Sequence, residues 1–157
     1  LGDVYKRQDK YSKEERSHLL GLPCPSFETT AFVSGPPLAE RRIALISTAG
    51  LHRSGDRPFT VGEADYRLIP ANTRSNDLVM SHISTNFDRT GFQLDLNLVF
   101  PLDRLSELVK QGFINSLAEY HYSFMGATDP RQMENAARNL SKIMKKDGVD
   151  SVLLVPV

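Results

Sequence analysis

The stretch Arg42-Ile-Ala-Leu-Ile-Ser-Thr-Ala-Gly50 decides the fold class. Its continuous apolar run, Ile43–Ile46, is typical of a short strand that is covered on both faces. The small residues Ser47–Gly50 that follow suit a turn at the end of such a strand, where functional groups are often carried. The pattern therefore predicts a buried strand whose end is available for chemistry.

Downstream of this strand, apolar spacing predicts alternating strands and helices. The segment Leu51–Ala64 lacks periodicity, and a loop of that length is usually functional or mobile. Proline after an aspartate N-cap at Asp129 predicts the start of a helix, and Gly148 marks its end. The full set of predicted elements comprises strands at Tyr66–Ile69, Leu117–Phe124 and Val152–Val155 and helices at Leu102–Phe113 and Asp129–Gly148.

This order of buried strands and helices predicts an α/β domain with a doubly wound, mostly parallel, Rossmann-like sheet. Ligands bind such sheets beyond the carboxyl ends of the strands. Three of these ends can be located, at Ser47–Asp56, Tyr122–Thr128 and Pro156-Val157. Because no loop follows the last strand, we expect the domain to be truncated and Val152–Val155 to lie at or near an exposed sheet edge, which favours self-association.

Composition excludes several classes of protein. The 157 residues include 19 basic and 19 acidic side chains, a neutral balance that argues against a nucleic-acid partner. Apolar runs of at most five residues exclude a membrane span of about 20 residues. The absence of a signal-peptide core predicts a cytoplasmic protein. A single cysteine, Cys24, excludes an internal disulfide and a multi-cysteine metal site.

The N-terminal part of the chain is predicted to lie outside the domain. Residues 1–8 lack an initiator methionine and are interpreted as a non-native leader. Residues 9–40 are first charged, with a possible short exposed helix at 9–20, and then rich in proline, which predicts an extended lead-in. The α/β domain itself is assigned to residues 41–157.

Polar side chains near the predicted strand ends are the first candidates for function. His52 and Asp56 lie four residues apart and could form an acid/base pair or act as ligands, although loop residues of this kind are commonly just solvated. Arg67 could anchor a substrate carboxylate, because guanidinium groups bind carboxylates bidentately. A structural ion pair is the alternative for Arg67.

The stretch Ser81–Gly91 is rich in Ser, Thr and Asn, which suits a binding loop and equally suits turns and caps. It offers His82 as an acid/base candidate and Thr85, Asn86 and Asp88 as substrate-binding candidates. A further candidate is His121, inside a predicted strand, where the alternative is a core histidine satisfied by one hydrogen bond.

The three histidines, with Asp56 and Asp88, follow no compact ligand spacing, so no metal site is predicted and a metal-dependent hydrolase stays a minor alternative.

Several blocks of the sequence, in order, resemble the substrate-specific B component of glycine, sarcosine and betaine reductases, which is related to D-proline reductase. The resemblance runs through about residues 36–157. The blocks that carry it are Ser47–Phe59, Asp65–Pro70, Ser81–Gly91, Asp95–Pro101, His121–Gly126 and Asp147–Val157.

The resemblance implies a reductase subunit that cleaves the C–N bond of a glycine-, sarcosine-, betaine- or proline-type amine with a disulfide as acceptor. It further implies a partner subunit with a pyruvoyl group, a selenoprotein A-like component and a thioredoxin system. The family's nucleophile, selenocysteine or cysteine, would follow Val157, so this chain would hold no cofactor and be inactive alone. We therefore expect an N-terminal fragment whose gene continues in frame through a UGA or cysteine codon. The alternative is a non-catalytic binding or assembly module of the same fold.

Overall fold

The structure, a computed structural model, describes residues 11–21, 26, 28–30, 32–84 and 89–157; the predicted leader at 1–8 lies outside them. The chain divides into two compact units, residues 1–32 and 33–157. In the first, helix α2 (Lys13–Leu20) forms where the charge-dense sequence predicts it. A capping box starts this helix: Glu15 N donates to Ser12 Oγ at 3.1 Å, and Ser12 N donates to Glu15 Oε2 at 2.9 Å. None of the described helices has the length and apolar character needed to cross a bilayer.

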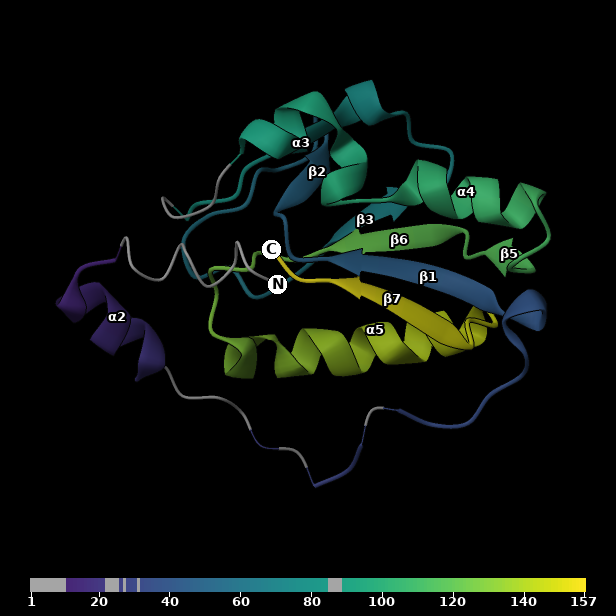
Figure 1. The fold of residues 1–157 in the computed structure, drawn as a ribbon, viewed down its shortest axis with the longest axis horizontal. Coiled ribbons are helices and arrows are strands. Elements are labelled where there is room, and N and C mark those ends of the chain that lie inside the picture. Colours follow the sequence, from purple (N-terminus) through teal and green to yellow (C-terminus); the bar gives the residue numbers. More distant parts are fainter. Residues whose placement is uncertain (1–10, 22–25, 27, 31, 85–88) are drawn as a thin grey trace. The chain divides into compact units, whose positions relative to one another are not determined.

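The second unit is built around a five-stranded mixed sheet (Figure 1). Strands β5 and β6 lie end to end along one edge of β1, and β7 lies along the other, all parallel to β1. The backbone shows the two edges directly. The Ile43 carbonyl accepts from Ala118 at 2.9 Å on one side. The Arg42 carbonyl accepts from Asp150 at 3.2 Å on the other. The strands are β1 (Arg42–Ser47), β3 (Arg67–Pro70), β5 (Ser116–Leu117), β6 (Tyr120–Ser123) and β7 (Ser151–Val155).

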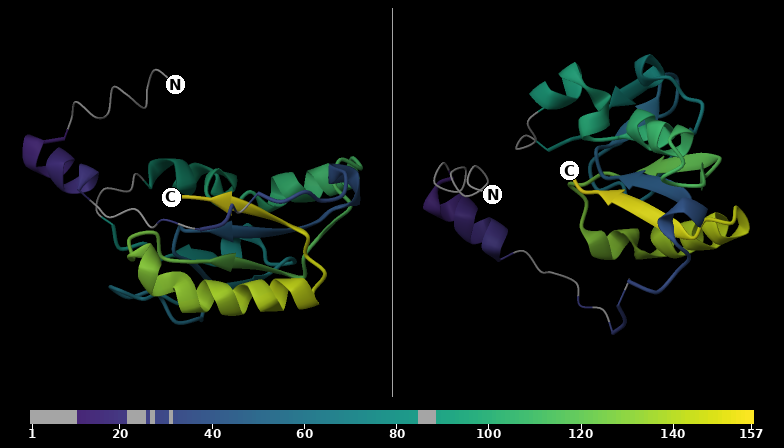
Figure 2. Two further views of the ribbon diagram at one scale, coloured as in Figure 1. Left: turned by 90° about the horizontal axis from the view of Figure 1, so that it is seen from below. Right: turned by 45° about the vertical axis from the view of Figure 1, so that its right-hand side comes forward.

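Two layers cover this sheet, one on each face (Figures 1 and 2). Along β1, Leu45 packs into one core and Ile46 into the other, because successive strand residues point to opposite faces. The first layer contains α3 (Thr90–Leu94), α4 (Leu102–Lys110) and an antiparallel ribbon of β2 (Leu51–Arg53) and β4 (Leu78–Met80), and the second is α5 (Glu134–Lys146). Short 3-10 helices lie at Leu38–Glu40, Ser75–Asp77, Leu96–Leu98 and Pro130–Met133.

The helix predicted from Asp129 to Gly148 is confirmed at both ends. Asp129 Oδ1 accepts a hydrogen bond from Arg131 N at 3.0 Å, and Pro130 opens a 3-10 turn that leads into α5. Gly148 follows the helix with φ of +70°, the left-handed conformation in which glycine commonly ends helices. The helix near residues 102–113 and the three predicted strands are also present, the strand at 117–124 being divided into β5 and β6.

The α/β class is confirmed and most pairings of the main sheet are parallel, but the doubly wound, Rossmann-like arrangement is not confirmed. β3 runs antiparallel to β6, and β2 and β4 pair outside the main sheet. The direction of a strand has no local signal in the sequence, because the apolar pattern of a short strand is the same whether its neighbour runs parallel or antiparallel. The prediction of a loop throughout Leu51–Ala64 is also wrong at its start, where β2 forms. This strand was missed because it has only three residues, too few to show a recognisable period.

His121 interrupts the ladder between β1 and its neighbour. From the paired positions 43/117 to 46/122, β1 advances three residues (46 − 43) and the neighbour five (122 − 117), so the neighbour bulges by two residues. The Leu45 N–H, on the edge of β1 that faces this bulge, donates to Nδ1 of His121 at 3.0 Å instead of to a carbonyl. The ring is fully buried, and burial lowers the pKa of His121 to about 4. A neutral imidazole is therefore part of the sheet.

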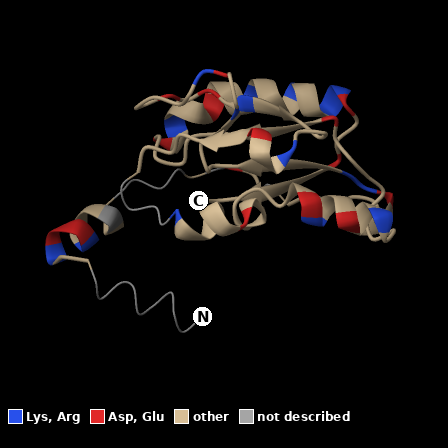
Figure 3. Ribbon diagram, turned by 90° about the horizontal axis from the view of Figure 1, so that it is seen from above, with Lys and Arg blue, Asp and Glu red and all other residues tan. Residues whose placement is uncertain are grey.

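Strand β7 forms an apolar edge of the sheet. Among the described residues it pairs only with β1, and Val152, Leu153 and Leu154 remain 39%, 38% and 66% exposed. Acidic and basic residues are interspersed along the helices (Figure 3), whereas β7 carries no charge. An uncharged apolar edge is a template for pairing with another strand.

We expect the purified 157-residue chain to self-associate through β7. Leu154→Lys should lower the average molecular mass, because a charge on the edge opposes strand pairing. Light scattering over a concentration series measures this. Val61→Lys, which alters an 85% exposed loop residue, is the matched control and should change nothing. A monodisperse wild-type monomer at high concentration would contradict the prediction.

His121 should make the stability of the fold depend on pH. Its pKa in the folded state, about 4, lies below the ordinary value of 6.5, so the unfolded chain binds the proton more tightly. The free energy of unfolding therefore falls as pH decreases from 6.5 toward 4, by about 2 kcal/mol between pH 6.5 and 5.

Urea unfolding at several pH values measures this loss. His121→Asn keeps an acceptor for Leu45 N–H but does not titrate, so its pH slope should be smaller than that of the wild type. His121→Ala should be less stable at every pH, because it leaves the buried amide unpaired. Equal slopes for the wild type and His121→Asn would rule out this role for the imidazole.

Candidate active site at the strand ends

The carboxyl ends of β1, β6 and β7 meet at one place, as the sequence predicts. Gly50 N donates to Phe124 O at 2.9 Å, and Thr48 N donates to Val155 O at 3.1 Å. In Figure 1 the carboxyl end of the chain lies beside the ends of β1 and β6, where the path toward β2 begins. We call residues 48–50, 124–126 and 155–157 the strand-end site.

Two glycines let the backbones approach closely there. Gly50 has φ of +65°, and a Cβ at this position would lie 3.0 Å from His82 Cα. A Cβ on Gly126 would lie 2.5 Å from Val157 O and 2.9 Å from Thr48 O. Larger residues would therefore push the three segments apart.

Buried hydroxyl groups hold the turn after β1. Ser47 Oγ accepts from Ala49 N at 3.2 Å, and Ser123 Oγ accepts from Leu51 N at 2.8 Å; both serines are fully buried. Ser81 Oγ accepts from Phe59 N at 2.9 Å, which ties the next loop to the same turn. Ser47 and Ser123 were not predicted individually from the sequence. The available signal was a small hydroxyl residue at or near the end of two predicted strands.

Two of the predicted histidines lie close to this turn. His52, in β2, is 4% exposed, and its Nδ1 lies 2.9 Å from Arg53 O. Because a carbonyl only accepts, Nδ1 donates its proton to it, and the second ring nitrogen is Nε2. This buried Nε2 has no hydrogen-bond partner among the described residues. His82 is also buried, its Nδ1 accepts from Ser84 N at 3.2 Å, and its carbonyl accepts from Arg89.

Burial, and secondly the nearby charge of Arg89, lowers the pKa of His82 below its ordinary value. The ring is therefore neutral near pH 7. A neutral imidazole can accept a hydrogen bond at one ring nitrogen and donate one from the other. This property suits His82 to acid/base or hydrogen-bonding work.

Asp56 is engaged by a different partner from the predicted one. Its carboxylate accepts from Arg53 Nε at 3.1 Å and Nη2 at 3.3 Å, and these hydrogen bonds lower the pKa of Asp56. Within the part of the chain that the structure describes, Asp56 and His52 form no hydrogen-bonded acid/base pair. The side chain is a half-buried member of a loop ion pair.

Arg67 forms a structural ion pair, which is the alternative that the sequence left open. Its Nη2 contacts Glu63 Oε1 at 2.6 Å, its Nε donates to Arg57 O at 2.8 Å, and the guanidinium lies 4.2 Å from the centre of the Phe59 ring. Burial alone would raise the pKa of Glu63, but hydrogen bonds from Arg67 and Thr60 hold it below its ordinary value. This cluster fixes the loop between β2 and β3, so a substrate carboxylate would have to displace Glu63.

The remaining candidates fall into three groups. Thr85, Asn86 and Asp88 lie outside the described residues. His121 lies inside the sheet with its Nδ1 already used by Leu45. Across residues 11–21, 26, 28–30, 32–84 and 89–157, no three His, Cys, Asp or Glu side chains are placed to share a metal ion, so the described structure offers nothing in favour of a metal-dependent hydrolase.

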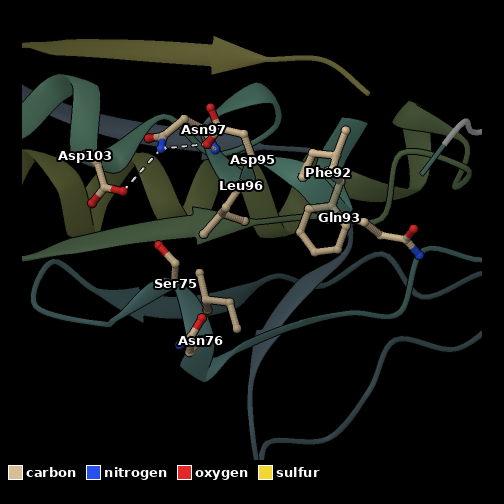
Figure 4. A pocket seen from close by; sticks show the side chains of 10 residues that line it. Ser75, Asn76, Phe92, Gln93, Asp95, Leu96, Asn97 and Asp103 are labelled. Carbon is tan, nitrogen blue, oxygen red and sulfur yellow. Dashed lines mark hydrogen bonds between the residues drawn. The ribbon is translucent and has the colours of Figure 1, made fainter. Parts of the chain in front are cut away.

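An open cleft of about 520 Å³ lies elsewhere, between the turn before β4 and the segment from α3 to α4 (Figure 4). It is polar on one side, where Asn97 Nδ2 donates to Asp95 at 3.0 Å and to Asp103 at 3.2 Å. None of the described candidate residues lines it. Of the described candidates, His52 and His82 lie near the strand ends, and the cleft is a separate surface feature.

Comparison with known proteins identifies a family and several curated relatives. The chain matches the family glycine/sarcosine/betaine reductase selenoprotein B over residues 25–157. It is 33% identical over 120 residues to D-proline reductase subunit gamma of Acetoanaerobium sticklandii, covering 74% of this chain and 49% of that protein. It is 32% identical over 141 residues to betaine reductase complex component B subunit beta of Peptoclostridium acidaminophilum, covering 85% and 32%. Glycine reductase complex component B subunit gamma of Symbiobacterium thermophilum is 27% identical over 140 residues, covering 84% and 32%.

No solved structure matches the chain. The chain spans about half the length of the D-proline reductase subunit and about a third of the other two relatives. The family match includes every strand of the sheet and the whole strand-end site. This chain belongs to the glycine/sarcosine/betaine reductase selenoprotein B family.

Proposed function

We propose that this chain forms the N-terminal part of the substrate-specific subunit of a reductase that cleaves the C–N bond of a glycine-, sarcosine-, betaine- or proline-type amine. Its relatives are named as subunits of such reductases. The structural observation that carries the proposal is the strand-end site. Three segments far apart in the sequence meet at the carboxyl ends of parallel strands, where α/β sheets bind ligands.

The proposed reaction consumes two electrons from a dithiol. The C–N bond breaks, the carbon and the nitrogen each gain a hydrogen, and the dithiol becomes a disulfide; the nitrogen is released as ammonia or an amine, or stays in the opened chain when the substrate is a ring such as proline. A selenocysteine or cysteine after Val157 would supply the nucleophile, and a pyruvoyl group on a partner subunit would activate the amine. A selenoprotein A-like component and a thioredoxin system would complete the transfer of electrons.

Residues of this chain would shape the site and handle protons. Gly50 and Gly126 let the backbone segments of the site pack directly against one another, which fixes their relative positions. We propose His52 and His82 as the hydrogen-bonding or acid/base groups, because both are buried beside the turn after β1 and Nε2 of His52 has no hydrogen-bond partner among the described residues. Arg67 and Asp56 are held in ion pairs and would act mainly by fixing the loop between β2 and β3.

The test of this function uses the longer subunit with its partner subunits. We expect the codon after Val157 to be UGA or a cysteine codon, with another cysteine codon a few positions later. We expect the assembled complex to oxidise a dithiol only when an amine from the panel of glycine, sarcosine, betaine and D-proline is present. Serine in place of the residue after Val157 should lower kcat on the order of 1,000-fold, since it removes the nucleophile.

Cys24→Ser is the matched control. It removes the one cysteine of the 157-residue sequence and should leave the rate unchanged. Dithiol oxidation that occurs at the same rate without any amine would contradict the proposed reaction. A correctly assembled complex with no dithiol oxidation at all would instead identify the chain as a non-catalytic binding or assembly module.

A further inference from the structure

The main chain of Val157 is held by a side chain rather than by a strand. Val157 N donates to Thr48 Oγ1 at 2.8 Å, and Thr48 Oγ1 donates to Val157 O at 3.2 Å. Two residues earlier, the ladder between β1 and β7 is still formed by the backbone, since Thr48 N donates to Val155 O at 3.1 Å. The Thr48 hydroxyl therefore continues the pairing beyond the end of β7.

Gly126 also restricts the backbone of Val157, because this glycine has no side chain. A Cβ on Gly126 would lie 2.5 Å from Val157 O, so the backbone of Val157 passes directly over this glycine. Gly126 in turn donates to Thr48 O at 2.8 Å. Thr48 and Gly126 together leave the peptide of Val157 one position, at the meeting point of β1, β6 and β7.

We propose that Thr48 is a positioning residue that aims the residue following Val157 into the strand-end site. This inference rests on the proposed function, in which that residue is the nucleophile. By fixing both polar groups of the preceding residue, the hydroxyl sets the direction in which the chain leaves β7. The nucleophile would thereby leave β7 in a fixed direction at the place where the carboxyl ends of β1 and β6 also lie.

Threonine suits this task for two physical reasons. Its hydroxyl donates one hydrogen bond and accepts others at the same time, which both contacts with Val157 require. Its β-branched side chain has few rotamers, so the hydroxyl is held in place at little cost in entropy. Valine has the same shape without the hydroxyl, and serine has the hydroxyl without the methyl group.

The first experiment measures hydrogen exchange at the Val157 amide in the longer subunit. Thr48→Val should make this amide exchange roughly tenfold faster, because its acceptor is removed, and Thr48→Ser should stay near the wild type. Thr73→Val, the same change in the turn after β3, is the matched control and should have no effect at Val157. Unchanged exchange in Thr48→Val would overturn the clamp itself.

The second experiment measures amine-dependent dithiol oxidation by the assembled complex. Thr48→Val should lower kcat about 10- to 100-fold with little change in the KM for the amine, because a misplaced nucleophile slows the chemical step. Thr48→Ser should recover most of the rate, and Thr73→Val should match the wild type. A merely structural role would not produce this division between kcat and KM.

The two failures are distinguishable. If the wild-type complex reacts and Thr48→Val keeps the full kcat, the positioning role is wrong and the proposed function stands. If the wild-type complex shows no amine-dependent reaction while Val157 exchange still responds to Thr48→Val, the clamp exists but the proposed function is wrong, and with it the role of Thr48 in catalysis.

Discussion

The hydrogen bond from Leu45 N–H to Nδ1 of His121 is the constraint on which the arrangement of the sheet depends. β1 is the central strand, and every parallel pairing in the sheet is made with it. The imidazole fills the gap that the two-residue bulge leaves opposite Leu45. Without this acceptor the bulge would leave a buried amide unpaired, at a cost of about 1–3 kcal/mol. One side chain thus lets two strand segments with different registers share one edge of β1.

This bulge also decides where the functional groups lie. If β6 kept the register of β5, position 120 instead of 122 would face position 46. Ser123 and Gly126 would then be carried two residues, about 7 Å, beyond the end of β1. In the observed register Ser123 reaches the turn after β1 and Gly126 lies under Val157. The strand-end site therefore exists because the register changes inside the sheet.

Rigidity around the site comes from buried polar contacts rather than from regular structure. The loop between β2 and β3 is tied together by the ion pair of Glu63 with Arg67, and Thr128 Oγ1 donates to Glu63 O at 2.9 Å. Ser81 links the same loop to Gly50. A segment without periodicity is consequently fixed by its own contacts. His52 in β2 and His82 just after β4 lie outside this loop and are buried. Such a site suits chemistry that needs its groups in fixed positions.

Sequence alone determined the features that have local causes. The apolar run at Ile43–Ile46 specifies a buried strand, and the Asp129 cap and Gly148 specify the limits of a helix, because these signals act within a few residues. The ordered blocks also identified the family, and the rule for parallel strands located the three ends that meet.

Only the tertiary structure decided how distant residues pair. The antiparallel direction of β3, the pairing of β2 with β4, the choice of Glu63 by Arg67 and the contact of Thr48 with Val157 depend on which backbones come together. A side chain's type states what it can bind, but its partner is selected by the fold. Thr48 shows this most clearly, since its partner lies 109 residues away and no spacing in the sequence predicts this contact.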